Sequence, residues 1–201
     1  MLLERNPFSK QINDQIASIV ESYTESLKKA LERPLIIGQG EQKRLDPTSI
    51  TWEEYLSSSN LNQKIKEDRA GTYTYDVSVE AFLYKFNKMD VPTYIPKLLP
   101  IIKNLFPDKN VIRSGGFYYP PGGFMGWHTN CKSPDLRLYI AYASHANKSF
   151  FRYLNEEEEI VDDYDDKGIT IRLFDIPKEP PHFWHCIGSD CDRYSAGFKI
   201  F

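Results

Sequence analysis

The strongest constraint on this fold is a run of six short apolar or alternating segments after residue 110. They cover residues 111–119, 136–143, 150–154, 169–175, 183–187 and 194–201. Turn-forming sequences separate them, notably Pro120-Pro121-Gly122-Gly123, Lys167-Gly168 and Pro180-Pro181. Strands at this spacing predict an antiparallel sandwich or barrel. The aromatic content of 14% agrees, because flat rings pack well on a pleated surface.

The first 110 residues have a different pattern, with apolar residues at helical spacing. Residues 9–32 predict an amphipathic helix that Pro34 ends, and residues 92–105 predict a second one. The first helix is expected to pack outside the β core, with dimerisation as the alternative. Residues 51–57 and 60–68 predict helical turns, and residues 35–38 and 72–77 short strands. The chain is therefore predicted to be mainly β with flanking helices (α+β).

The size and spacing indicate one domain over residues 1–201, with a helical and edge-strand region at 1–110 and a β core at 111–201. The net charge of -3 and the lack of a long basic stripe argue against nucleic acid as the main partner. We expect a monomer or dimer.

The composition also bears on the compartment. The N-terminus lacks a signal-peptide pattern, and no apolar run is long enough to span a membrane. The three cysteines (Cys131, Cys186 and Cys191) form no Cys-x-x-Cys pair, which favours reduced thiols in a cytoplasmic protein.

His128 is the first candidate metal ligand. It lies in Gly126-Trp127-His128-Thr129-Asn130, after the glycine-rich turn, and the spacing places it ahead of a strand. Residues i and i+2 of a strand point the same way, so a His-x-carboxylate pattern would offer two ligands to one metal. A distant histidine would complete a two-His-one-carboxylate face with positions left open for substrate and oxygen.

His185 is the best distant partner, because it lies inside the apolar segment 183–187. His182 is the alternative ligand if that segment is irregular. Arg193 and Ser195 follow on the next strand, where a guanidinium fork and a hydroxyl can hold the carboxylate of a dicarboxylic acid.

These residues resemble a known family in their order and spacing. Residues 113–201 are similar to the catalytic core of the iron(II)- and 2-oxoglutarate-dependent oxygenases, especially the prolyl-hydroxylase-like branch. The matching features are Tyr119-Pro120 before the glycine-rich turn, His128-Thr129-Asn130, Arg137 opening the next strand, Lys167-Gly168 before 169–174, His185, and Arg193-x-Ser195.

The resemblance implies a double-stranded β-helix, or jelly roll, that binds iron(II), 2-oxoglutarate and O2 and hydroxylates an unactivated carbon. It implies that His128 and His185 are metal ligands, that Arg193 with Ser195 anchors 2-oxoglutarate, and that Tyr119 donates a hydroxyl to it. A small molecule or a protein side chain is the expected substrate.

Asn130 departs from the family pattern, which has Asp or Glu at this position. Asn130 could ligate iron through its amide oxygen. The metal could instead be held by two histidines and waters, as in relatives resembling aspartyl/asparaginyl hydroxylases. The third reading is a non-catalytic jelly-roll module that binds metal or a small dicarboxylate.

The substrate side of the site is less constrained by the sequence. Arg137 could meet an acidic substrate group or form a salt bridge with the acidic segment 156–166, and Trp127 is another candidate contact. Other candidates depend on which strand faces look inward: Arg152, Arg172, Trp184, Tyr139 and Tyr142. The acidic segment is expected to be a solvated hairpin loop, with a lid or a weak site for calcium or a basic substrate as alternatives.

Overall fold

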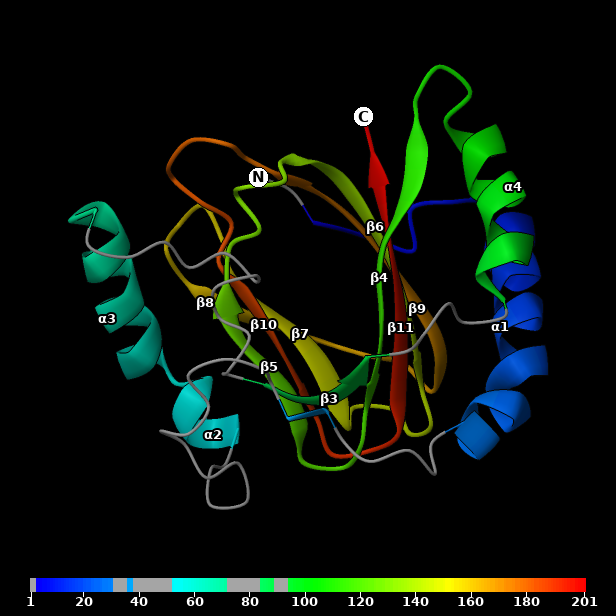
Figure 1. The fold of residues 1–201 in the computed structure, drawn as a ribbon, viewed down its shortest axis with the longest axis horizontal. Helices are drawn as coiled ribbons and strands as arrows, with labels where there is room; N and C mark the ends of the chain where they lie inside the picture. The colour runs from blue at the N-terminus through cyan, green and yellow to red at the C-terminus, as the bar shows by residue number, and fades with distance from the viewer. Residues whose placement is uncertain (1–2, 31–35, 38–51, 72–83, 89–93) are drawn as a thin grey trace.

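The structure is a computed structural model that describes residues 3–30, 36–37, 52–71, 84–88 and 94–201. Its core is two antiparallel sheets that face each other (Figure 1). In spatial order, the first sheet consists of β1 (Glu4–Arg5), β9 (Gly168–Ile176), β6 (Asp135–Ala143), β11 (Arg193–Ile200) and β4 (Val111–Tyr119). The second consists of β5 (Gly123–His128), β10 (His185–Ser189), β7 (Ser149–Leu154) and β8 (Ile160–Tyr164).

One strand joins the two sheets. β3 (Tyr84–Lys88) pairs with β4 through its end and with β5 through its start, and β2 (Ile36–Ile37) pairs with β3. All pairings are antiparallel, and from β4 to β11 the chain alternates between the two sheets except at the β7–β8 hairpin, whose strands share one sheet. This is the predicted double-stranded β-helix.

The helices lie on the outer faces of the sheets (Figure 1). α1 (Lys10–Ala30) and α4 (Ile95–Leu105) cover the first sheet, as predicted for an amphipathic pair. α2 (Trp52–Tyr55) and α3 (Ser58–Arg69) lie beside the second, and Ser57 caps α3 by accepting a hydrogen bond from the Asn60 amide. Among the described residues, no helix has the length and apolar character needed to cross a membrane.

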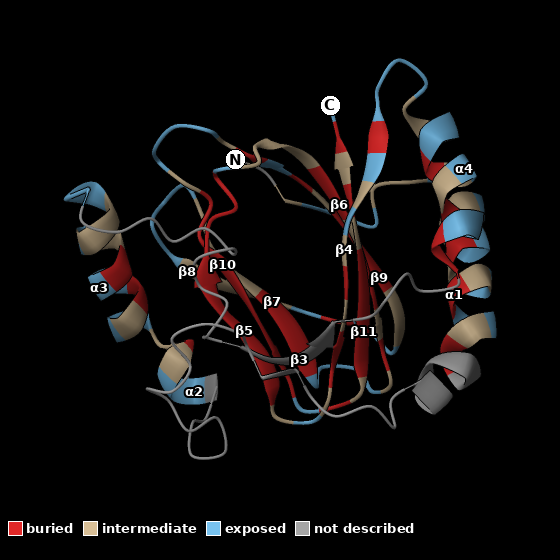
Figure 2. Ribbon diagram, in the orientation of Figure 1, coloured by how far each residue is buried: buried red, intermediate tan, exposed pale blue. Residues whose placement is uncertain are grey.

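The apolar side chains form three clusters, and most of the buried residues lie on the strands of the two sheets (Figure 2). Ile16 and Val20 of α1 pack against the outer face of the first sheet. Trp127 and Trp184 pack with Leu56 and Leu61 on the outer face of the second. A third cluster, formed by residues such as Phe151, fills the space between the sheets. This interior cluster surrounds the candidate site.

The six predicted strands of residues 111–201 are confirmed, but two more strands were not predicted. β5 begins at Gly123, in the sequence that was predicted to be a turn. His128 was predicted to precede a strand, but it is the last residue of β5. β8 occupies half of the acidic segment, so the prediction of a solvated loop there is wrong. The predicted strand at 72–77 lies outside the described residues.

Candidate metal centre

His128 and His185 lie opposite each other inside the barrel. They are register partners where β5 ends and β10 begins, and their ring centroids are 4.2 Å apart. Both are buried, with 2% and 0% of their surfaces exposed. Two histidines from strands 57 positions apart in sequence therefore form a single site.

A β-bulge in β5 orients His128 into the barrel. Met125 pairs with Ile187 and His128 pairs with His185, so three steps along β5 match two along β10. The extra residue reverses the alternation, and Met125 and His128 both face inward. Bulges re-aim side chains next to functional sites in this way.

Backbone carbonyls fix both imidazoles in one orientation. The Nδ1 atom of His128 lies 2.7 Å from the Gly126 oxygen, and that of His185 lies 2.9 Å from the Phe183 oxygen. A ring that donates from Nδ1 presents an unprotonated Nε2, the form that ligates metals. Burial lowers the pKa of His185 well below its usual value, and the neighbouring His128 lowers it further. His185 is therefore neutral at physiological pH.

Asn130 completes the cluster from a turn. Its backbone has φ 57°, a left-handed conformation that Asn tolerates better than most residues. Its amide Nδ2 lies 3.1 Å from the His185 Nε2, and its side chain also hydrogen-bonds the Tyr139 phenol. The expected strand alternation does not bring Asn130 here, since β5 ends at His128. The left-handed turn does.

Two predicted site residues lie elsewhere. His182 points toward α3, with its Nε2 3.9 Å from an Asp68 carboxylate oxygen, so the structure brings His185 and not His182 to His128. Trp127 is fully buried in the cluster on the outer face of β5, away from the two histidines. Its position does not favour the substrate contact that was predicted for it.

Arg193 lies on the inner face of β11 beside the histidines. It is paired in register with Tyr119, and its guanidinium carbon lies 5.3 Å from the centre of the Tyr119 ring. One small cavity is lined by Arg193, Ser195, Tyr119, His128 and Tyr139 together. The Nη1 of Arg193 is buried and makes no hydrogen bond to any described residue. The predicted anchor residues thus share one cavity with a candidate ligand.

A buried carboxylate that sequence reasoning missed holds Arg193 in place. Asp165 accepts hydrogen bonds from the Arg193 Nε at 2.8 Å, the Arg172 Nη1 at 2.6 Å and the Ser149 Oγ at 2.5 Å. Burial alone would raise the pKa of Asp165, but the two arginine charges and the Ser149 bond lower it far below its usual range. Asp165 is therefore ionised, and Arg193 is fixed through one edge of its guanidinium.

The acidic segment pairs with arginines other than the predicted one. Asp162 accepts two hydrogen bonds from Arg152, and Asp163 accepts one from the Arg172 Nε at 2.5 Å. Arg137 instead donates to the Ser133 carbonyl. Arg137 is buried on the inner face of β6, and its charge contributes to the low pKa of His185. The expected salt bridge between Arg137 and this segment is thus replaced by Arg152 and Arg172.

Tyr139 was one of several candidates for the substrate side of the site in the sequence, and Phe183 was not singled out. Tyr139 shares the inner face of β6 with Arg137, so strand alternation could have placed it there. Phe183 packs its ring on His185 at 5.3 Å, and its carbonyl orients that imidazole. Nothing local in sequence distinguishes Phe183 from a core residue.

The donor set fits a divalent transition metal at two positions and partly at a third. His128 and His185 offer imidazole nitrogens, and the amide of Asn130 lies beside them. Within the described residues, no group of three or more His, Cys, Asp or Glu side chains could hold a metal ion, because the third position is an amide. Two imidazoles are thus the candidate ligands that the structure brings together, and the atom that Asn130 turns to His185 is its amide Nδ2.

Comparison with known proteins identifies the fold. No family model matches the chain, and no curated protein sequence matches it. A prolyl hydroxylase from Trichoplax adhaerens, solved in complex with a hypoxia inducible factor oxygen degradation domain peptide, matches with TM-score 0.50 and 12% identity over 100% of this chain and 82% of its own. A Pseudomonas putida prolyl-4-hydroxylase matches with TM-score 0.43 and 13% identity, covering 92% of this chain and 97% of its own. A Burkholderia pseudomallei oxidoreductase of the 2OG-Fe(II) oxygenase family matches with TM-score 0.40 and 10% identity, covering 68% and 76%. The chain has the prolyl-hydroxylase fold.

Proposed function

We propose that this chain is an iron(II)- and 2-oxoglutarate-dependent oxygenase that hydroxylates an unactivated carbon of an amino-acid or protein side chain. The observation that carries this proposal is the pair of buried imidazoles at 4.2 Å, His128 and His185, next to Arg193. A structural core needs neither a buried histidine pair oriented by carbonyls nor a buried guanidinium nitrogen that makes no hydrogen bond.

In this proposal His128 and His185 hold the metal through Nε2, and the Asn130 side chain turns its oxygen toward the metal. The carbonyls of Gly126 and Phe183 retain the Nδ1 protons, so both ligands are ready without proton transfer. Bound iron would supply the oxygen-activating chemistry, with 2-oxoglutarate as the source of electrons. The ring of Phe183 and its aromatic neighbours keep water away from His185.

Arg193 would bind the far carboxylate of 2-oxoglutarate through Nη1, while Asp165 retains the opposite edge. Ser195 and Tyr119 line the same cavity and would add hydroxyl contacts. Burial raises the pKa of the Tyr119 phenol, so it remains a proton donor to that carboxylate. A polypeptide substrate is in keeping with the fold, since the Trichoplax prolyl hydroxylase was solved with a peptide.

The test is an anaerobic titration with iron(II) and 2-oxoglutarate that follows the visible metal-to-ligand charge-transfer band, and then succinate formation in air. We expect the band in the wild type and in His145→Ala, whose exposed ring lies outside the centre. We expect no band in His128→Ala. If the wild type forms no band and binds no iron, or if His128→Ala forms an unchanged band, the proposal fails.

A non-catalytic module that binds a metal or a small dicarboxylate is the second candidate. One observation favours it: the third ligand position is a neutral amide, whose Nδ2 lies 3.1 Å from the His185 Nε2. Such a protein would bind iron(II) and 2-oxoglutarate under argon, and it would form no succinate in air with any substrate offered.

A further inference from the structure

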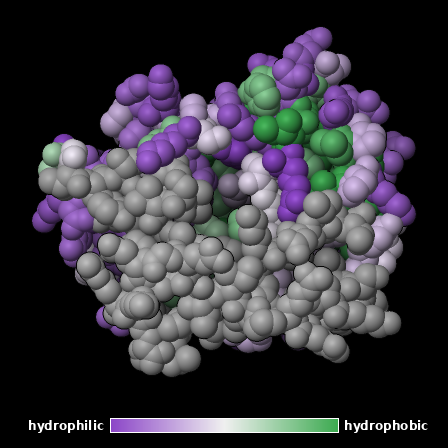
Figure 3. Space-filling view, viewed as in Figure 1, coloured by the Kyte–Doolittle hydropathy of each residue, from purple (hydrophilic) through white to green (hydrophobic). Residues whose placement is uncertain are grey.

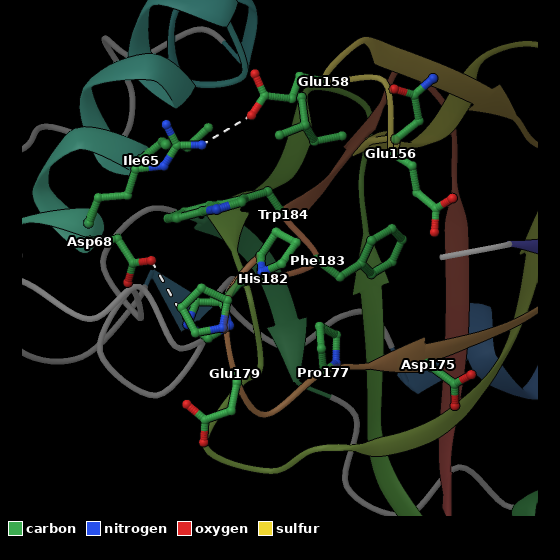
Figure 4. Close-up of a pocket in the computed structure, with 15 residues that line it drawn as sticks. Ile65, Asp68, Glu156, Glu158, Asp175, Pro177, Glu179, His182, Phe183 and Trp184 are labelled. Atoms are coloured by element: carbon green, nitrogen blue, oxygen red, sulfur yellow. Dashed lines mark hydrogen bonds and ion pairs between the residues drawn. The ribbon is translucent and has the colours of Figure 1, made fainter.

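A groove with a cavity volume of about 630 Å³ opens between α3, the β7–β8 hairpin and the segment that leads into β10 (Figure 4). This acidic groove is lined by five carboxylates: Asp68, Glu156, Glu158, Asp175 and Glu179. Its size is in the range of pockets that bind extended ligands. It is separate from the small cavity that contains Arg193 and His128.

The groove carries a strong local negative charge. Arg69 is its single basic lining residue among the described ones, so five carboxylates and one guanidinium leave a formal charge of -4. Arg69 is itself paired with Glu158 at 3.1 Å. The whole chain has a net charge of only -3, so the rest of the molecule is close to neutral and the charge is concentrated here. Hydrophilic side chains dominate this edge of the molecule (Figure 3).

His182 gives a second, independent indication of a ligand. Its side chain is 10% exposed, and it lines the groove with its Nε2 3.9 Å from Asp68, beyond hydrogen-bond range. Its Nδ1 is buried and makes no hydrogen bond to a described residue. A buried polar atom without a hydrogen bond costs free energy, so the wall of the groove at His182 holds an unsatisfied polar group, which an occupant reaches if the ring turns toward it.

Aromatic side chains connect the groove to the candidate metal centre. Phe183 lines the groove, packs its ring on His185 at 5.3 Å and orients that imidazole through its carbonyl. Trp184 also lines the groove, and its indole lies between α3 and His182 in the close-up (Figure 4). Aromatic faces beside carboxylates favour guanidinium and ammonium groups over neutral ones.

We propose that the acidic groove binds arginine or lysine side chains of a polypeptide substrate, next to the residue that enters the metal centre. Carboxylates along the rim would pair with the cations, and the ring of Trp184 would contact their apolar stems. The proposal that the groove binds substrate rests on the proposed oxygenase function. The proposal that it binds basic peptides does not depend on that function.

Isothermal titration calorimetry of the full chain with a hexa-arginine peptide at low ionic strength tests the proposal. The neutral hexa-citrulline peptide serves as the isosteric ligand control. We expect measurable binding of hexa-arginine, weakening as salt is added, and no binding of hexa-citrulline. The double variant Glu156→Gln/Glu179→Gln should bind roughly fivefold to tenfold more weakly, from two partly exposed ion pairs. His182→Leu should also bind more weakly.

The matched control is Asp14→Asn/Asp108→Asn, which removes the same charge from exposed positions on the α1 and α4 side of the fold. It should keep the wild-type Kd within twofold. Equal weakening in both double variants would mean only general charge attraction and would overturn the site. Spermidine binding as tightly as hexa-arginine would assign the groove to a free polyamine and overturn the peptide proposal. Binding of hexa-arginine is independent of the iron titration, so either proposal can fail alone.

Discussion

The substitution Asp165→Asn tests whether the buried charge network holds the anchor strand in place. Asp165 is fully buried and accepts hydrogen bonds from Arg193, Arg172 and Ser149 at 2.8, 2.6 and 2.5 Å. Asparagine has almost the same volume, so the cavity term is small. It removes the charge, however, and sets an amide donor against guanidinium donors.

The magnitude follows from the burial of both partners. The side chain of Arg193 is 2% exposed and that of Arg172 is 1% exposed, so neither can turn to water. Removing one partner of a buried pair costs about 3–5 kcal/mol, because it leaves a buried charge uncompensated. That is a large part of the roughly 5–15 kcal/mol that holds a typical domain folded. At about 2–4 °C per kcal/mol for a chain of this size, the Tm should fall by roughly 6–20 °C.

Urea denaturation followed by circular dichroism measures the loss. The control is Asp162→Asn in β8, because Asp162 pairs with Arg152 at 2.5 Å but is 25% exposed. We expect the control to lower the free energy of unfolding by about 1 kcal/mol or less, as is usual for partly exposed ion pairs. The reasoning is refuted if Asp165→Asn has the same free energy of unfolding as the wild type, or as Asp162→Asn.

Three further substitutions and one pH dependence test the site and the core. Asn130→Asp should raise iron(II) affinity at least about tenfold in anaerobic titration, from the added ligand charge. An unchanged affinity would mean that residue 130 does not face the metal. In the wild type, 2-oxoglutarate at 100 times its Kd should stabilise the fold by about 2.7 kcal/mol, which raises the Tm. Arg193→Gln should abolish this rise in Tm. Burial raises the pKa of Asp165, but the arginine charges lower it further, well below its usual 3.8. The ionised Asp165 therefore stabilises the fold above about pH 4, and this stabilisation is lost as the pH falls below that. In Asp165→Asn the free energy of unfolding should consequently fall less steeply as the pH is lowered. Gly188→Ala should lower the free energy of unfolding by about 1–3 kcal/mol in urea denaturation, since its Cβ would overlap the Phe150 ring.

Much of the fold could be predicted because its signals are local. The spacing of Ile16 and Val20 predicts α1, and these side chains do pack on the first sheet. Residues 111–119 alternate and form β4 with the same bounds. β5 was not predicted from the sequence, because the glycines at positions 123 and 126 are typical of turns. Gly126 nevertheless lies in the bulged strand. Tertiary pairing with β10 overrides that local preference.

The sequence by itself determined the β core, the outer helices and three residues, His128, His185 and Arg193, that the structure gathers around the interior cavities. His185 and Arg193 lie on the consecutive strands β10 and β11, and the pairing of β5 with β10 adds His128. Only the tertiary structure decided the orientation of His128, through the bulge, and the place of Asn130, through its left-handed turn. It also decided which carboxylate of the acidic segment is buried against Arg193. Eight carboxylates between residues 156 and 166 look alike in sequence, and only the tertiary contacts with Arg193, Arg172 and Ser149 distinguish the fully buried Asp165 from the exposed glutamates of the hairpin tip.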